Sequence, residues 1–420
     1  MKIFIQMNQE KTLKYLQAGR NVFLTGPAGS GKTYVLTKFI DWLREQGKTV
    51  AITASTGIAA THLGGTTIHS WAGIGIKDFL NDYDLDALTQ KQYLHKRFRT
   101  TDVLIIDEVS MLHSFRLDMI DTVLRTILQV PLPFGGIQVV LAGDFFQLPP
   151  INRDSTDTHF AFEARVWPQM NIATCYLETV YRQSDDDPLL QVLQEIRQGK
   201  VSEESAALLQ ERINVQPPDH VTPTRLYTHN IDVDALNKKE LAQLSTPIEI
   251  FEMTSSGKKA DVDTLKKYCL APERLELKVG AQVMFVKNNF SQGYVNGTLG
   301  TVIDFDAGQP VVQTAKGREV TVDRDSWMME QNGVLKAEIR QFPLRLAWAI
   351  TVHKSQGMTL DVVDVDLSKA FAAGMGYVAL SRVKTLNGLH IRGINRQALA
   401  VDPTVQQFDA IFQEQSAQLQ

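Results

Sequence analysis

Gly26-Pro27-Ala28-Gly29-Ser30-Gly31-Lys32-Thr33 is the stretch of this sequence that decides the fold. It matches the pattern G-x-x-x-x-G-K-[ST], in which glycines let the backbone wrap closely around a phosphate. The apolar run before it, at 21–25, reads as a buried strand, and apolar residues at helical spacing follow it. Strand, turn and helix in this order aim backbone N–H groups at an anion. The stretch therefore predicts a phosphate-binding loop, in which Lys32 reaches the β- and γ-phosphates and the Thr33 hydroxyl binds Mg²⁺.

The composition is that of an ordinary globular protein, with 44% hydrophobic and 21% charged residues among 420. This length predicts two or three domains. The net charge of −4 gives no global basic field, although a local positive channel would be enough to bind nucleic acid. Cys175 and Cys269 are expected to be buried small hydrophobes rather than a disulfide or a metal pair. Because the sequence has no apolar run of about 18 residues and no signal peptide, we expect a cytoplasmic protein that crosses no membrane.

Two further apolar strands end in polar side chains that suit nucleotide chemistry. The run 103–106 ends in Asp107 and Glu108, which are predicted to hold Mg²⁺ and to orient and activate a water molecule, respectively. Adjacent carboxylates at the end of a buried strand are costly to bury without a cation. The run 138–142 leads into Gly143–Pro150, where Gln147 can sense the γ-phosphate or position water. The alternation of strands and helices predicts a doubly wound parallel sheet with nucleotide at the carboxyl ends of its strands.

Other polar residues near these strands are candidates for base and nucleic-acid contacts. Gln9 offers a donor and an acceptor, which suits the edge of adenine, although a surface glutamine on a helix is the simpler interpretation. The segment after strand 50–54 is rich in Ser, Thr, Gly and His, and it is either a set of phosphate and sugar contacts or an ordinary polar loop. Residues 77–99 interleave aromatics with cations and aspartates, so a base-stacking surface and a solvated helical insert both remain open.

The second half of the chain changes character. Short strands between turn residues across 245–345 predict a small antiparallel barrel inserted into a second α/β domain, which resumes with a strand at 346–350. Arg182 and Arg382 are candidate arginine fingers, because a guanidinium is planar, always charged and bidentate toward phosphate. His353 and Lys354 follow the strand and could touch the phosphates of a polymer or of ATP, although a lone residue at such a place is usually structural.

Together these blocks resemble superfamily 1 DNA helicases, specifically the PIF-type (petite integration frequency) helicases. The most specific matches are TASTGIAATHLGGTTIHSWAGIG at 53–75, DEVSML at 107–112, GDFFQLPP at 143–150, LAWAITVHKSQGMTL at 346–360 and YVALSR at 377–382. The segment after Met111 looks like the signature helix of that family. The resemblance runs from Gln9 to about Gly393. RecD-type helicases share the same order of motifs, but the residues within these motifs differ.

The resemblance implies two RecA-like domains that close on one ATP and its Mg²⁺. Residues 1–180 would form the first domain, 181–244 with 346–420 the second, and 245–345 an SH3-like β-barrel. Residues 73–100 look like the small insert of the family, which carries a strand-separating wedge, and Gln9 becomes the adenine contact. The catalytic roles fall to Lys32, Asp107, Glu108, Gln147, Arg182 and Arg382. The DNA-binding positions of the family map onto Thr56, Thr67, His69, His353 and Lys354.

By the same resemblance we expect an ATP-dependent motor that translocates 5′→3′ on single-stranded DNA. It would unwind duplex, forked and G-quadruplex DNA as a monomer, in DNA repair, recombination and telomere maintenance. Many eukaryotic relatives carry long N-terminal extensions, so the short arm here is expected for a bacterial or phage protein.

Two other classes remain as alternatives. The first is a nucleotide-gated DNA-binding ATPase that moves nothing, and such a module would need no arginine finger. The second is a GTPase, for which Asn237-Lys238-Lys239-Glu240 faintly resembles the guanine-reading N-K-x-D but ends in Glu.

Overall fold

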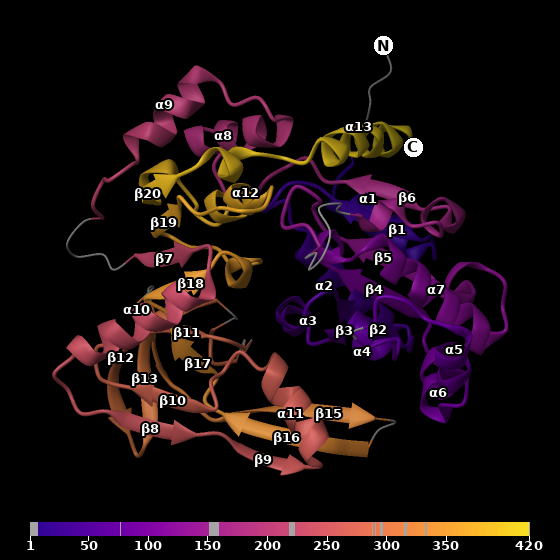
Figure 1. Cartoon of the computed structure of the whole chain (residues 1–420), viewed down its shortest axis with the longest axis horizontal. Coiled ribbons are helices and arrows are strands. Elements are labelled where there is room, and N and C mark those ends of the chain that lie inside the picture. The colour runs from indigo at the N-terminus through magenta and orange to yellow at the C-terminus, as the bar shows by residue number, and fades with distance from the viewer. Residues whose placement is uncertain are drawn as a thin grey trace. The chain divides into compact units, whose positions relative to one another are not determined.

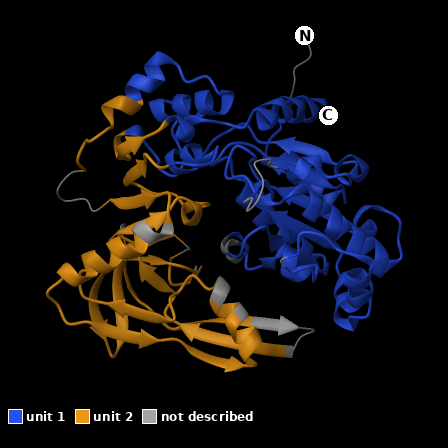
Figure 2. Cartoon of the chain, in the orientation of Figure 1, with its two compact units in different colours: residues 1–208, 370–386, 396–420 blue, residues 209–369, 387–395 orange. Residues whose placement is uncertain are grey.

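The computed structural model describes residues 7–75, 77–150, 159–217, 223–287, 289, 291–294, 297–314, 317–331 and 334–419. The chain divides into two compact units, which Figure 2 distinguishes by colour. Unit 1 comprises residues 1–208, 370–386 and 396–420, and unit 2 comprises residues 209–369 and 387–395. Residues 370–386 and 396–420, which the sequence places in the second domain, thus group with unit 1. The domain boundaries given above stay predictions.

Unit 1 is organised around a six-stranded parallel sheet in the order β3-β2-β4-β5-β1-β6 (Figure 1). Its strands are β1 (Val22–Thr25), β2 (Val50–Ala54), β3 (Thr66–Thr67), β4 (Val103–Asp107), β5 (Gln138–Ala142) and β6 (Ala173–Tyr176). The predicted parallel sheet is therefore confirmed, with β1, β2, β4 and β5 close to their predicted bounds, while the sequence analysis predicts neither β3 nor β6. Because β4, β5 and β1 are neighbours, their carboxyl ends bring Asp107, the segment 143–150 and the loop 26–33 to one edge of the sheet.

Unit 1 also contains helices. They are α1 (Gln9–Gln17), α2 (Lys32–Glu45), α3 (Gly57–His62), α4 (Ile68–Trp71), α5 (Asp82–Thr89), α6 (Gln92–Arg99), α7 (Ser114–Leu128), α8 (Pro188–Gln198), α12 (Met375–Leu380) and α13 (Pro403–Gln418), while α9 (Glu203–Glu211) runs across the boundary between the units. Helix α2 buries Val35, Phe39 and Leu43 against the sheet, as the helical spacing predicts. Helix α8 begins where Asp187 Oδ1 accepts a hydrogen bond of 2.9 Å from Leu189 N.

Helix α13 covers an aromatic cluster in the core of unit 1. The Phe412 ring centroid lies 5.0 Å from that of Phe23, and the Phe408 centroid lies 4.3 Å from that of Phe162. Ser416 Oγ accepts a hydrogen bond of 3.0 Å from Tyr176 N on β6. Burying four aromatic rings contributes several kcal/mol, since each removes a large apolar area from water. The last helix therefore belongs to the same core as β1 and β6.

The segment 77–99 is mostly helical, as one of the two sequence interpretations states. Phe98 of α6 is buried against Trp71, with ring centroids 4.9 Å apart. Phe79 and Tyr83, by contrast, are 72% and 82% exposed. The insert thus packs by one aromatic residue and presents two others to solvent, so its wedge role stays a prediction.

Unit 2 combines one parallel sheet with antiparallel sheets. The parallel sheet has the order β18-β7-β19-β20, with β7 (Thr224–Tyr227), β18 (Ala349–Thr351), β19 (Val363–Leu367) and β20 (Leu389–Ile394). Helix α10 (Asn230–Gln243) packs on β18. The five-stranded antiparallel sheet has the order β14-β13-β12-β11-β17, with β11 (Gln282–Phe285), β12 (Leu299–Asp306), β13 (Gln309–Thr314), β14 (Glu319–Thr321) and β17 (Leu344–Leu346).

The remaining strands of unit 2 form two smaller sheets. Strands β8 (Glu249–Glu252) and β10 (Arg274–Leu277) pair with each other, and β9 (Thr254–Gly257), β15 (Asp325–Gln331) and β16 (Val334–Gln341) form a three-stranded sheet beside α11 (Lys259–Tyr268). The β-rich, antiparallel character expected for 245–345 is present. Its assignment as an SH3-like barrel stays a prediction.

The single strand predicted at 346–350 is wrong, because this segment divides between two sheets. Strand β17 pairs with β11, and β18 pairs with β7. Between them, Trp348 is buried in the core of the antiparallel sheet, while its carbonyl accepts a hydrogen bond of 3.0 Å from Arg225 N. One apolar run thus serves two sheets, and hydrophobicity alone gives no sign of the change.

Both cysteines are free, with Cys175 buried and Cys269 half-buried. Across the described ranges, no helix combines the length and the apolar character needed to cross a membrane.

Candidate functional site

The loop 26–33 connects β1 to α2 in a conformation that requires glycine at positions 26, 29 and 31. Gly29 and Gly31 have φ values of 85° and 87°, in the left-handed region. A Cβ on Gly31 would lie 2.1 Å from Gln9 Nε2, and a Cβ on Gly29 would lie 2.7 Å from Arg182 Cβ. Gln9 Nε2 also donates to Ser30 O at 3.3 Å. Gln9 and Arg182, two residues selected from the sequence, are therefore both placed directly against this loop.

Lys32 lies inside the loop and holds its first residues. Its Nζ donates to Gly26 O at 2.8 Å and to Pro27 O at 3.0 Å. Burial lowers the pKa of Lys32, while the nearby carboxylates of Asp144 and Glu108 raise it. An ammonium ion so placed, beside the backbone N–H groups that open α2, makes the loop an anion site.

Asp107 and Glu108 lie at the end of β4, as predicted. Glu108 has a φ of 50°, and its N–H donates to Asp107 Oδ1 at 2.8 Å. Burial raises the pKa of Asp107 to about 6 and that of Glu108 to about 7, and the charge of Asp107 adds to the shift of Glu108. Two carboxyl groups whose pKa values are raised in this way favour a bound cation that offsets their mutual repulsion.

The residues present fit a magnesium–nucleotide. Glu108 Oε2 and Gln147 Oε1 are buried acceptors that lack a hydrogen-bond partner among the described residues, so both are open to a water molecule. Asp107 and the exposed Thr33 offer the carboxylate and hydroxyl oxygens that Mg²⁺ prefers. No cluster of three or more His, Cys, Asp or Glu suited to a metal occurs in the described residues. Mg²⁺ here would therefore rely on phosphate oxygens and water for its remaining ligands.

Arg182 and Arg382 lie close together, and Arg382 lies near Glu108. Arg182 Nη1 donates to Ser381 O at 2.8 Å, and Arg382 Nη2 donates to Ser381 Oγ at 2.8 Å. Burial and the charge of Arg382 lower the pKa of Arg182 to about 9. Arg382 is only 2% exposed, and the charge of Glu108 partly opposes the effect of burial on its pKa. The six predicted catalytic residues thus all lie in unit 1, around one loop.

The predicted DNA contacts divide between the units. In unit 1, Thr56 Oγ1 accepts from Ala59 N at 3.2 Å and Thr67 Oγ1 accepts from Ser70 N at 3.3 Å, so both hydroxyls stabilise helix starts. In unit 2, burial lowers the pKa of His353 and of Lys354, the latter also because Arg345 is near. Both residues follow β18, at the strand end where the sequence places them. Their contact with DNA stays a prediction.

His69 is held neutral by its surroundings. Arg116 Nη1 lies 3.2 Å from His69 Nε2, and burial together with the charges of Arg116 and His113 lowers the pKa of His69 to about 4. Because the folded protein binds this proton less tightly than the unfolded chain, His69 makes stability fall as the pH decreases from about 6.5 to 4. When the pH is lowered over that range, we expect the melting temperature of the wild type to fall further than that of His69→Asn, by a few degrees. Equal losses would show that His69 titrates normally.

A buried polar network that the sequence did not reveal adjoins the loop. Arg197 of α8 donates to Asp144 Oδ1 at 2.7 Å, and Tyr377 of α12 accepts a hydrogen bond of 3.0 Å from Ala28 N. Asp144 stands within a stretch that the sequence analysis selected, but only Gln147 was singled out there. Arg197 lies on α8, whose sequence is that of an ordinary amphipathic helix, so no local signal distinguishes Arg197.

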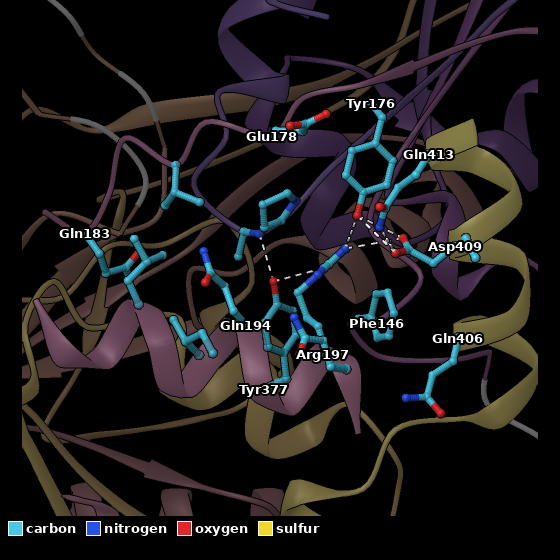
Figure 3. A pocket seen from close by; sticks show the side chains of 17 residues that line it. Phe146, Tyr176, Glu178, Gln183, Gln194, Arg197, Tyr377, Gln406, Asp409 and Gln413 are labelled. Atoms are coloured by element: carbon cyan, nitrogen blue, oxygen red, sulfur yellow. Dashed lines mark hydrogen bonds and ion pairs between the residues drawn. The ribbon is translucent and has the colours of Figure 1, made fainter. Parts of the chain in front are cut away.

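Beside this network lies a pocket of about 620 Å³, shown in Figure 3. Arg197 is central in the view, with dashed lines toward Tyr377, Tyr176 and Asp409. Pro27 and Ala28 of the loop contribute to its wall, and Gln406 and Gln413 of α13 line the other side. The pocket therefore reaches from the phosphate loop to the C-terminal helix.

The guanine-reading alternative finds no support at its candidate motif. Asn237 is buried on α10, where its side-chain amide donates to Ala349 O at 2.9 Å and accepts from Ala349 N at 3.0 Å. Glu240 pairs with Arg225 at 2.7 Å. Both side chains are engaged in holding α10 against the parallel sheet of unit 2.

Comparisons with known proteins identify two matching family models. Residues 4–207 match the model of the PIF1-like helicase, and residues 262–305 match that of the 2B domain of DNA helicase Pif1. The chain is 42% identical to the ATP-dependent DNA helicase Pif1 of Psychrobacter sp. (strain PRwf-1), over 99% of this chain and 72% of that protein. It is 39% identical to the ATP-dependent DNA helicase Pif1 of Bdellovibrio bacteriovorus, over 98% of this chain and 93% of that protein.

Three solved structures are similar over the same extent, with 97% of both chains covered in each case. Pif1 from Bacteroides sp. in complex with ADP-AlF4 has a TM-score of 0.84 at 32% identity. Bacteroides Pif1 bound to single-stranded DNA has a TM-score of 0.67 at 31% identity. The same values describe a structure of DNA unwinding at forked duplex DNA by two coordinating Pif1 helicases.

Proposed function

This chain belongs to the PIF1-like helicase family and is an ATP-dependent DNA helicase, and from that premise we propose that it translocates 5′→3′ along single-stranded DNA. It unwinds duplex, forked and G-quadruplex DNA, and it serves DNA repair, recombination and telomere maintenance. The observation that supports the motor most directly is the gathering of Lys32, Glu108 and Arg382 around one loop. A module that only bound nucleotide would need neither a water-orienting carboxylate nor a buried arginine there.

We assign the hydrolytic roles to the residues around the loop. Lys32 and the N–H groups of Gly29–Thr33 bind the phosphates, and Glu108 and Gln147 orient the attacking water through the two acceptors left open to it. Arg182 and Arg382 stabilise the charge on the transferred phosphoryl group. Thr33 and Asp107 would hold Mg²⁺, which would neutralise phosphate charge when bound.

We further assign the recognition of adenine to Gln9 and Tyr181. Tyr181 is 65% exposed, its N–H donates to Gly29 O at 2.9 Å, and its ring lies 3.8 Å from the position of a Cβ on Gly31. Gln9 borders the same glycine. An exposed aromatic face and an amide on one side of a phosphate loop are suited to stacking on a base and reading its edge.

Alanine at either position tests this assignment. We expect Gln9→Ala and Tyr181→Ala each to raise the KM for ATP about tenfold, because one hydrogen bond or one stacked ring is lost. Gln9→Ala should also reduce the preference for ATP over GTP, whereas Tyr181→Ala should not. Steady-state hydrolysis with both nucleotides measures this, with the exposed Gln46→Ala as a matched control. An unchanged ATP-to-GTP ratio in Gln9→Ala would remove Gln9 from this role.

The DNA path of the proposal combines several regions of the sequence. Thr56, Thr67 and His69 in unit 1 and His353 and Lys354 in unit 2 contact the strand, and the segment 73–100 separates the duplex. The SH3-like assignment of 245–345 belongs to the same proposal. The solved relative bound to single-stranded DNA supports this class of partner. We propose that a monomer is the active form. The alternative is that two copies act together, as in the solved structure of two coordinating Pif1 helicases at forked DNA.

One experiment tests the direction and the activity together. ATP hydrolysis is measured with and without single-stranded DNA, beside unwinding of duplexes that carry either a 5′ or a 3′ tail. We expect strong stimulation by DNA, with unwinding from the 5′ tail only. Unwinding from the 3′ tail would reverse the proposed direction. Hydrolysis without unwinding from either tail would favour a nucleotide-gated DNA-binding ATPase.

A further inference from the structure

We propose that Tyr377 is a positioning residue for the phosphate loop, and that the ion pair of Asp144 and Arg197 connects it to Asp409 on α13. The inference rests on the nucleotide role proposed for the loop. The inference assigns a role to Tyr377, which does not touch the reacting atoms. It also gives a chain of contacts through which the C-terminal helix α13 influences nucleotide binding.

The contact with the loop is a single buried hydrogen bond. Ala28 N donates to the Tyr377 hydroxyl at 3.0 Å, and Tyr377 is only 1% exposed. Ala28 lies between Gly26 and Gly29, whose φ values of 137° and 85° belong to regions that only glycine enters easily. A loop so rich in glycine is free to move when it is unanchored. Fixing Ala28 before the nucleotide arrives therefore removes part of the ordering cost of binding.

The Tyr377 hydroxyl is itself held in place from the opposite side. It donates to Asp144 Oδ2 at 3.2 Å and accepts from Arg197 Nη1 at 3.2 Å, in addition to the bond from Ala28. One donor and two acceptor positions are the full capacity of a phenol, so its orientation is determined. A Cβ on Gly374, at the start of α12, would lie 2.5 Å from Gln147 O. The helix that carries Tyr377 is thus fixed against the segment that carries Gln147.

Arg197 extends this arrangement to α13. Its Nη2 donates to the Tyr176 hydroxyl at 2.8 Å and pairs with Asp409 at 3.5 Å, while its guanidinium lies 4.2 Å from the centroid of the Phe146 ring. Tyr176 also donates to Asp409 Oδ1 at 3.0 Å. The carboxylate of Asp409 therefore orients the guanidinium that orients the Tyr377 hydroxyl. Figure 3 shows Arg197 between Tyr377 and Asp409, with dashed lines toward both.

Conservative variants test the role of Tyr377 without removing its ring. We expect Tyr377→Phe to raise the KM for ATP about tenfold with kcat changed less than about threefold, because the loss acts on ordering the loop. Asp409→Asn should raise the KM about threefold, because Asp409 acts on Tyr377 only through Arg197. Tyr294→Phe is the matched control and should leave the KM unchanged, because it removes the hydroxyl of another buried tyrosine, in unit 2, whose ring centroid lies 3.9 Å from that of Phe285.

The double variant decides whether Asp409 acts through Tyr377. If it does, Tyr377→Phe/Asp409→Asn raises the KM no more than Tyr377→Phe alone. The inference is overturned if the two substitutions raise the KM independently, so that their effects multiply in the double variant. It is also overturned if Tyr377→Phe leaves the KM unchanged or lowers only kcat. Melting temperatures of all variants separate a folding defect from a positioning defect, and Asp409→Asn on the half-buried face of α13 remains decisive if Tyr377→Phe folds poorly.

The measurements use ATP hydrolysis without DNA and binding of a fluorescent ADP analogue. Their failure is distinguishable from failure of the proposed function. A wild-type protein that neither hydrolyses ATP nor binds the ADP analogue would contradict the nucleotide role itself. A wild-type protein that does both, with variants that match it, would contradict only the role of Tyr377.

Discussion

Arg382→Ala lowers the kcat of DNA-stimulated ATP hydrolysis by about 10³-fold, which is the effect expected on removal of an arginine finger. Arg382 is 2% exposed, and its guanidinium is held by Val378 O at 2.9 Å and Ser381 Oγ at 2.8 Å. These hydrogen bonds fix the orientation of the guanidinium before the reaction. Its charge is therefore already in place when the phosphoryl group is transferred, and no free energy is needed to reorient it. Because the interaction strengthens only as charge develops, the KM for ATP should change by less than about fivefold.

Two further variants make this result interpretable. Arg382→Lys keeps a positive charge but loses the planar fork, and we expect it to recover no more than about a tenth of the activity. Arg44→Ala removes an exposed arginine of α2 and should behave as the wild type. Single-turnover hydrolysis measures the chemical step, and circular dichroism checks the fold. A kcat within about threefold of wild type in Arg382→Ala would exclude the finger role.

Glu108→Gln should also reduce kcat about 10³-fold, while retaining ATP binding. The substitution preserves the size of the side chain but removes the carboxylate that would accept a proton from water. Glu108 is suited to that role because burial raises its pKa to about 7, and Oε2 has no hydrogen-bond partner among the described side and main chains. Gln147 Oε1, the other acceptor without such a partner, remains and accounts for residual activity.

The measurement for Glu108→Gln is a comparison of binding with turnover. Filter binding with labelled ATP should give wild-type stoichiometry, and the bound nucleotide should be recovered as ATP rather than ADP. Glu45→Gln, an exposed carboxylate at the end of α2, is the control for loss of one charge. Recovery of ADP at the wild-type rate would mean that another group orients the water.

The sequence identified those parts of the site that local chemistry encodes. The runs that became β1, β2, β4 and β5 are mostly apolar because parallel strands are largely buried, and each leads into polar residues of the types that suit phosphate or sugar contacts. Loop 26–33 is recognisable because few residue types tolerate its backbone.

The network around Arg197 could not be found in the same way. Asp144 lies in the segment after β5, while Arg197, Tyr377 and Asp409 lie on α8, α12 and α13, and each is separated from the others by tens or hundreds of residues. In its own segment each polar residue is compatible with a solvated surface, and only the folded chain brings them together. The division of 344–351 between two sheets was missed for a related reason, because Trp348 continues the apolar run across the break.

The position of α13 in the core of unit 1 has a consequence for how the protein is made. Strands β1 and β6 are complete early in synthesis, but the rings of Phe408 and Phe412 that cover Phe23 and Phe162 emerge only after the whole of unit 2 has been translated. Elongation at about 5–20 residues per second leaves this apolar surface uncovered for tens of seconds. A nascent chain on the ribosome therefore carries the complete phosphate loop without the helix that closes its core, with apolar surface exposed to water during that interval.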